Sequence, residues 1–139
     1  MIDAPQFYSV KREVEQVSQK EGVGATSFEI LTATAFSLFA RADPPLDLAV
    51  VEVGMGGAED ATNFVPADKT LLSIVTSVDL DHQKFLGETV HKIAQVKAGI
   101  ARDGGDVVLS AQAHAEAREA VLAIARAKRA TVPFLNRHS

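Results

Sequence analysis

Two polar stretches follow apolar runs and contain residue types that could do chemistry. The first, residues 52–63, has the sequence EVGMGGAEDATN, with three glycines followed by short polar side chains. Glycines let backbone amides come close to a ligand, so this stretch could cradle an anion or orient a substrate. It lacks the lysine of a Walker A loop, and so does GVGATS at 22–27. A tight turn after a strand is the simpler interpretation of the glycines.

Two side chains in or beside these stretches are candidate metal ligands. Glu52 stands near the end of an apolar run, where a carboxylate must be paired, hydrated or bound to a cation, unless it lies in water beyond the sheet. His82 belongs to the second stretch, DLDHQKFLG at 79–87. Oxygen ligands with one imidazole suit Mg²⁺ or Mn²⁺. A capping or surface role is the simpler interpretation of His82.

Lys97 is a third candidate, because its neighbours Ala94, Val96, Ala98 and Ile100 are small or apolar. One interpretation is a lysine whose aliphatic stem is buried while its ammonium reaches water. The other is a lysine whose pKa is lowered by burial, so that the neutral amine can react, for example with carbon dioxide.

The elements that must position these residues follow from apolar patterning. Period-3.6 runs predict helices around 7–17, from Thr26 or Ser27 to about Arg41, at 88–100 and at about 113–129. β-branched apolar runs predict strands at 47–53, 69–76, 106–110 and 131–135. Such strands, joined partly through helices, predict an α/β fold with a mostly parallel sheet flanked by helices. The two polar stretches would then lie beyond carboxyl ends of neighbouring strands, where ligands bind in such sheets, and Glu52 and His82 could meet there.

Composition narrows the class of protein. The 139 residues are 47% hydrophobic and 23% charged, which is typical of one globular domain. A net charge of -4 argues against nucleic-acid binding, and the absence of cysteine excludes disulfides and thiolate metal sites. The sequence shows neither an apolar signal-peptide centre nor a membrane span, so we expect a cytoplasmic protein; a mitochondrial address would require an upstream segment.

Four motifs occur in order: TSFEILTATAF (26–36), EVGMGGAEDATN (52–63), LDHQKFLGETVHKIA (80–94) and KAGI (97–100). Together they resemble the central ATPase domain of the folylpolyglutamate synthase and dihydrofolate synthase branch of the Mur ligase superfamily. The resemblance implies a partial P-loop-type fold and an ATP-dependent ligase of folate biosynthesis and one-carbon metabolism. In such an enzyme ATP phosphorylates the carboxylate of a pteroate or folate, and the amine of L-glutamate attacks the acyl phosphate. It also implies Mg²⁺ as cofactor and a monomer when the enzyme is complete.

Carried over by motif, the resemblance implies that Glu52 and His82 bind magnesium. Lys97 would be carbamylated and would help to hold a second cation, so that His82 and Lys97 are the catalytic residues. The implied pteroate-binding residues are Thr26, Ser27, Phe28, Glu29, Glu59, Asp60 and Ala61. Phe28 would pack on the pterin.

Two departures limit the resemblance. Ala58 stands where many relatives have arginine, and we find no counterpart of the phosphate-binding loop, of its magnesium-binding serine or of the C-terminal glutamate-binding domain. We therefore expect residues 1–139 to be a partial central domain, a fragment or a degenerate paralogue, that does not turn over alone. A non-catalytic pterin- or folate-binding module and a protein-interaction remnant are the alternatives. The choice between dihydrofolate synthase and polyglutamate synthase activity stays open.

Overall fold

The computed structural model describes residues 2–133, which divide into two compact units, Met1–Glu52 and Val53–Ser139. The first unit is helical and the second is α/β.

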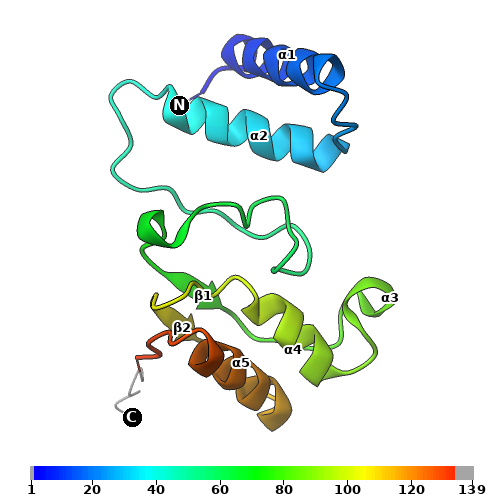
Figure 1. Ribbon diagram of the computed structural model, residues 1–139, viewed down its shortest axis with the longest axis vertical. Coiled ribbons are helices and arrows are strands. Elements are labelled where there is room, and N and C mark those ends of the chain that lie inside the picture. The colour runs from blue at the N-terminus through cyan, green and yellow to red at the C-terminus, as the bar shows by residue number, and fades with distance from the viewer. Residues whose placement is uncertain (1, 134–139) are drawn as a thin grey trace. The chain divides into compact units, whose positions relative to one another are not determined.

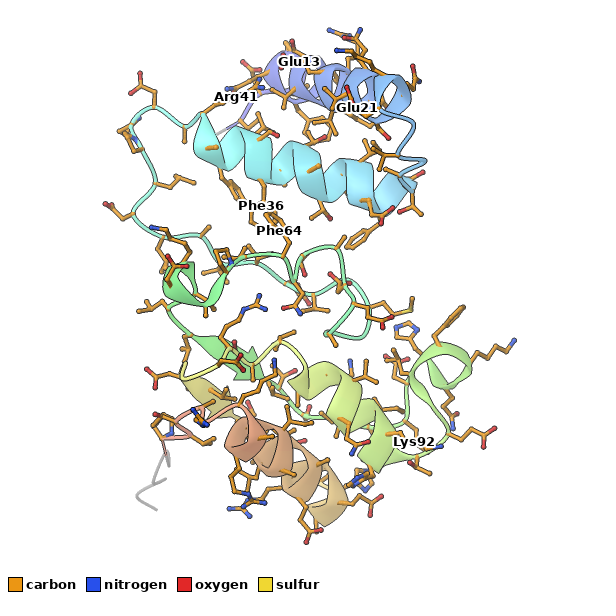
Figure 2. The ribbon with its side chains drawn as sticks, viewed as in Figure 1. Glu13, Glu21, Phe36, Arg41, Phe64 and Lys92 are labelled. Atoms are coloured by element: carbon orange, nitrogen blue, oxygen red, sulfur yellow. The ribbon has the colours of Figure 1, made fainter. Side chains whose placement is uncertain are left out.

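The first unit is a pair of packed helices, α1 (Ala4–Lys20) and α2 (Ser27–Ala40), as Figure 1 shows. The turn between them contains Gly22 and Gly24, both at positive φ, a conformation that glycine adopts without steric cost. Val10, Ile30 and Leu38 form its buried apolar contacts. At the other end of the pair, Arg41 Nη1 lies 2.8 Å from Glu13 Oε2, and Figure 2 labels both side chains. Both predicted helices are confirmed.

The second unit is built around two parallel strands, β1 (Ser73–Val75) and β2 (Val107–Leu109), in the register Ser73↔Val107. A 3₁₀ turn, η1 (Ala67–Lys69), precedes β1. The connection between the strands contains α3 (Gln83–Leu86) and α4 (Val90–Ala98), and α5 (Ala115–Ala127) follows β2. The predicted α/β class and parallel pairing are confirmed, with helices α4 and α5 packed together beside the strands (Figure 1).

One apolar core holds the second unit together. Ile93 on α4, Val107 on β2 and Val121 on α5 are fully or almost fully buried in it, and Val75 joins them from β1. Residues alternate between the two faces of a strand, so Ile74 points away from this core and is 53% exposed. The helices therefore cover one face of β1.

The predicted strand at 47–53 is wrong for the part of the chain that the structure describes. This segment contains no strand, it forms no backbone hydrogen bond, and Leu48 and Val50 are 62% and 89% exposed. The physical reason is that an apolar run becomes a strand only where another backbone is beside it to accept and donate its hydrogen bonds.

Other boundaries also differ from the expectation. The predicted strand at 69–76 shrinks to Ser73–Val75, because the chain turns through η1 first, and the strand at 106–110 shrinks to Val107–Leu109. At 131–135 only Thr131 forms a single parallel bridge, to Asp106, and residues 134–135 lie outside the described part. The short helix α3 was not predicted. Within residues 2–133, no helix is both long and apolar enough to cross a membrane.

Candidate active site

The glycine-rich stretch packs directly on the C-terminal end of α4, which carries Lys97. The Ala58 N–H donates to the Val96 carbonyl at 3.2 Å. A Cβ atom added to Gly57 would lie 2.7 Å from the Val96 oxygen and 2.8 Å from the Lys97 oxygen. A Cβ added to Gly99 would lie 2.4 Å from the Ala58 Cβ. All three distances are too short for any side chain, so the contact depends on two glycines from different segments.

Asp60 organises the rest of this stretch. Its carboxylate accepts from the Met55 N–H at 2.8 Å, the Thr62 N–H at 2.9 Å and the Thr62 hydroxyl at 2.6 Å. Partial burial alone would raise the pKa of Asp60, but hydrogen bonds from the Thr62 hydroxyl and these N–H groups outweigh burial, so its pKa lies below the usual range. Asn63 closes the loop by donating its side-chain N–H to the Ala58 carbonyl at 2.9 Å.

Three other candidate site residues in the second unit make no side-chain hydrogen bond or ion pair with the described residues. Lys97 is half-buried, and its ammonium makes no hydrogen bond or ion pair with the described residues. Glu59 is exposed and Ala61 is partly buried. The structure thus brings Lys97 to the glycine-rich loop by its backbone and leaves its amine available.

His82 occupies an unusual backbone conformation at the start of α3. Its φ of 49° is in the left-handed region, which non-glycine residues seldom adopt. Its N–H donates to Asp81 Oδ1 at 2.8 Å, and its ring Nε2 lies 3.5 Å from Asp81 Oδ2. His82 stands at the N-cap position, yet its side chain makes no capping hydrogen bond and is 47% exposed. The imidazole is therefore a surface group with Asp81 as its neighbour.

The loop between β1 and His82 is tied to the residues after β2. Gln112 Nε2 donates to the Thr76 carbonyl at 3.0 Å and to the Ser110 carbonyl at 2.9 Å, while its Oε1 accepts from the Val78 N–H at 2.9 Å. Asp79 Oδ1 lies 3.3 Å from His114 Nε2. The hydrogen bond from the Leu80 N–H and, to a smaller extent, the contact with His114 hold the pKa of Asp79 below its usual range.

Sequence reasoning missed Gln112 and Arg102 as organisers of the site. Arg102 donates to the Asn63 carbonyl and to the Thr70 hydroxyl, both at 3.3 Å. A signal for Gln112 was present, because an amide just beyond an apolar strand can reach the end of the neighbouring strand. Arg102 gave no such signal, since its partners lie more than thirty residues away in the sequence.

In the first unit, two of the predicted pteroate-binding residues form a capping box at the start of α2. The Glu29 carboxylate accepts from the Thr26 N–H at 2.7 Å and from its hydroxyl at 2.8 Å, and the Glu29 N–H donates to the Thr26 hydroxyl at 3.3 Å. The Thr26 N–H, and then its hydroxyl, hold the pKa of Glu29 below the usual range. Phe28 is 42% exposed, and Ser27 lines a polar cleft of about 270 Å³ with Lys11 and Glu15.

The predicted magnesium ligands have suitable donor atoms. Glu52 offers an exposed carboxylate without a hydrogen-bond partner in the described residues, and His82 offers an exposed imidazole. Residues 2–133 contain no group of three or more His, Asp or Glu side chains that could hold a metal ion. The Glu52 carboxylate and the His82 imidazole therefore fit Mg²⁺ as donors, but the described side chains do not form a complete metal site by themselves.

Comparison with known proteins identifies relatives of one kind, although no family model matches the chain. It is 36% identical over 103 residues to the dihydrofolate synthetase of Saccharomyces cerevisiae, covering 74% of this chain and 24% of that protein. It is 38% identical over 129 residues to the dihydrofolate synthase/folylpolyglutamate synthase of Bacillus subtilis, covering 93% of this chain and 28% of that protein. The chain thus spans about a quarter of the length of these relatives.

Solved structures agree with the sequence relatives. The folylpolyglutamate synthase of Mycobacterium tuberculosis complexed with ADP and AMPPCP superposes with a TM-score of 0.79 at 35% identity, covering 95% of this chain and 31% of that one. A folylpolyglutamate synthase (FPGS)–AMPPCP–folate complex gives a TM-score of 0.77 at 35% identity and covers 89% of this chain and 29% of that one. By sequence and by fold, the chain is therefore similar to a part of the dihydrofolate synthases and folylpolyglutamate synthases.

Proposed function

We propose that this chain is part of an ATP-dependent amide ligase that joins L-glutamate to dihydropteroate or to a (tetrahydro)folate. The observation that carries the proposal is the contact between the glycine-rich loop at 54–58 and the α4 turn of Lys97. This contact unites two of the motifs on which the family resemblance rests. Relatives solved with AMPPCP and with folate support ATP and a folate as ligands of the complete enzyme.

In the proposed reaction, the substrate carboxylate attacks the γ-phosphorus of ATP and ADP leaves. The glutamate amine then attacks the acyl carbon, phosphate leaves, and an amide bond remains. Lys97 would act as its carbamate, formed when the neutral amine adds to carbon dioxide and loses a proton. Glu52, His82 and the Lys97 carbamate are the residues that would hold magnesium, which supplies charge neutralisation to phosphoryl transfer when bound.

Three of the predicted pteroate-binding side chains are already hydrogen-bonded within the chain. Thr26 and Glu29 satisfy one another in the capping box, and Asp60 is occupied by Met55 and Thr62. We therefore propose that these three residues hold the local backbone in place. Phe28 and Ser27 would contact the pterin, together with Glu59 and Ala61 of the loop. The cytoplasmic address and a monomeric complete enzyme stay predictions.

The test combines the purified chain with a chimera. Because the chain spans about a quarter of its relatives, we expect it to bind folate in a calorimetric titration without forming an ATP-dependent amide by itself. The chimera replaces the matching segment of the Bacillus subtilis relative with this chain. We expect it to join glutamate to dihydropteroate or tetrahydrofolate in the presence of magnesium and bicarbonate, with the unaltered relative as positive control.

A matched variant makes the chimera informative. Lys97→Ala in the chimera should abolish amide formation, whereas Lys84→Ala, at an exposed position of α3, should leave it unchanged. A folded chimera that binds folate but forms no amide would favour the non-catalytic binding module instead. A folded chimera that does neither would overturn the proposed function.

A further inference from the structure

Gln112 uses its whole side-chain amide to join the ends of the two parallel strands. Thr76 directly follows β1 and Ser110 directly follows β2, and the carbonyls of both accept from Gln112 Nε2, at 3.0 and 2.9 Å. The carboxyl ends of β1 and β2 lie side by side in Figure 1. One neutral side chain therefore supplies both donors that these two carbonyls need.

The third hydrogen bond of Gln112 reaches into the loop itself. Val78 is 1% exposed, so water cannot readily satisfy its N–H, and the Gln112 Oε1 accepts from it at 2.9 Å. A buried N–H that loses its partner destabilises the folded chain, because water cannot replace the lost hydrogen bond. Gln112 therefore stabilises the chain in the conformation that buries the Val78 backbone N–H.

A second contact also joins the loop after β1 to the residues after β2. Asp79 directly follows Val78, and its carboxylate lies 3.3 Å from the ring of His114, two residues after Gln112. The chain then runs through Asp81 to His82, whose left-handed φ of 49° sets where the imidazole points. The start of the loop is held at Thr76, Val78 and Asp79, and His82 follows three residues later.

We infer that Gln112 is a positioning residue for His82: it fixes the loop that presents the imidazole, and through His82 it acts on the reaction. This inference rests on the proposed function, since it gives His82 its role there. Gln112 acts through the backbone of Thr76 and Val78.

The test substitutes Gln112 in the full chain and follows the loop by NMR. Gln112→Met keeps the length of the side chain and removes all three hydrogen bonds. The Val78 amide should then exchange with solvent at least about tenfold faster, while the core amide of Ile93 keeps its rate. Gln112→Glu keeps an acceptor for Val78 and loses the two donated bonds, so Val78 exchange should be intermediate.

The matched control is Gln95→Met on the exposed face of α4, where the glutamine makes no side-chain hydrogen bond with the described residues. It should leave the Val78 rate unchanged. If Gln112→Met does not unfold the chain and Val78 still exchanges at the original rate, the positioning role is overturned. If Gln112→Met unfolds the chain, the Val78 exchange rate is compared in Gln112→Glu, and an unchanged rate there overturns the positioning role.

A second measurement separates this inference from the proposed function. Mn²⁺ is titrated as a paramagnetic probe, and the concentration that half-broadens the His82 ring signals is recorded. It should rise severalfold in Gln112→Met and stay constant in Gln95→Met. No broadening in the unaltered chain would overturn the metal-binding role of His82, and with it the link to the reaction. Equal broadening in Gln112→Met and the unaltered chain would overturn the positioning role alone.

Discussion

The two loops of the second unit that carry predicted site residues are fixed by different physical means. The glycine-rich loop at 54–63 is held on α4 by close backbone contact, since Gly57 and Gly99 leave no room for a Cβ. The loop at 76–82 is set by polar side chains, because Gln112 and His114 reach it from beyond β2. The contact of the first loop with α4 depends on the absence of side chains at Gly57 and Gly99, whereas the second loop is held by the side chains of Gln112 and His114.

This difference predicts how each loop responds to change. Steric contact is insensitive to pH and salt and intolerant of any added atom. Hydrogen bonds and ion pairs tolerate replacement at a smaller cost, and the charged ones respond to pH and ionic strength. The contact between the glycine-rich loop and the α4 turn should therefore not depend on pH, whereas the aspartate contacts in both loops should.

The largest effect is expected for Gly99→Ala. The new Cβ would lie 2.4 Å from the Ala58 Cβ and 2.8 Å from its Cα, so loop and helix must separate. Overpacking of this kind costs about 1–3 kcal/mol of unfolding free energy. Urea denaturation followed by circular dichroism measures it.

A compensating variant sharpens this prediction. Ala58→Gly removes the nearest atom, so the double variant Ala58→Gly/Gly99→Ala should recover part of the loss. Gly104→Ala is the control, because its added Cβ meets nothing within 4 Å and only the positive φ is strained. Strict additivity of the Ala58 and Gly99 changes would contradict a direct steric contact.

The next effect is expected at Asp60. Asp60→Ala removes the acceptor of three hydrogen bonds, from Met55 and Thr62, and should lower the unfolding free energy by about 1–3 kcal/mol. Thr62→Val removes only the hydroxyl donor and should cost about 1 kcal/mol. If Asp60→Ala weakened folate binding without lowering stability, Asp60 would be a ligand contact and not an organiser.

The sequence predicted much of the fold because helices carry their own signals. The signals that predict α1, α2, α4 and α5 lie within single segments of the sequence. They are the capping residues Thr26 and Glu29 and the helical spacing of apolar residues such as Val10 and Val121. Strands depend on partners far along the chain. The runs at 47–53 and 73–75 are both mostly apolar, yet within the described residues only the second pairs with another strand, β2.

For the candidate site, the sequence identified the loops but not what holds them. The glycines of EVGMGG indicated a close approach, but the surface that they approach, at Val96 and Lys97, is about forty residues away and no local pattern encodes it. The family resemblance implied a pteroate contact for Asp60, and the sequence did not show that its carboxylate accepts from Met55 and Thr62. A side chain that binds its own loop and one that binds a ligand share the same residue type.

Acid should destabilise both loops through their aspartates. Asp60 and Asp79 have folded-state pKa values below the usual range, so each contributes stability that is present above the unfolded pKa and lost as pH falls through the folded one. Unfolding free energy should therefore decline below about pH 4. Asp60→Asn and Asp79→Asn should each flatten that decline. A variant with an unchanged acid slope would show that its aspartate has no such role.

The smallest effect is expected for the Asp79 and His114 pair, because both side chains are exposed, at 76% and 38%. A double-mutant cycle of Asp79→Asn and His114→Gln measures their coupling. Since exposed charges are screened, the coupling should weaken as salt rises to about 1 M, where the Debye length is about 3 Å. The neutral bonds of Gln112 should not weaken in the same titration, so Gln112→Met serves as the reference. If the coupling persisted at high salt, the pair would act as a neutral hydrogen bond, and polar contacts alone, without charge, would hold the loop at 76–82.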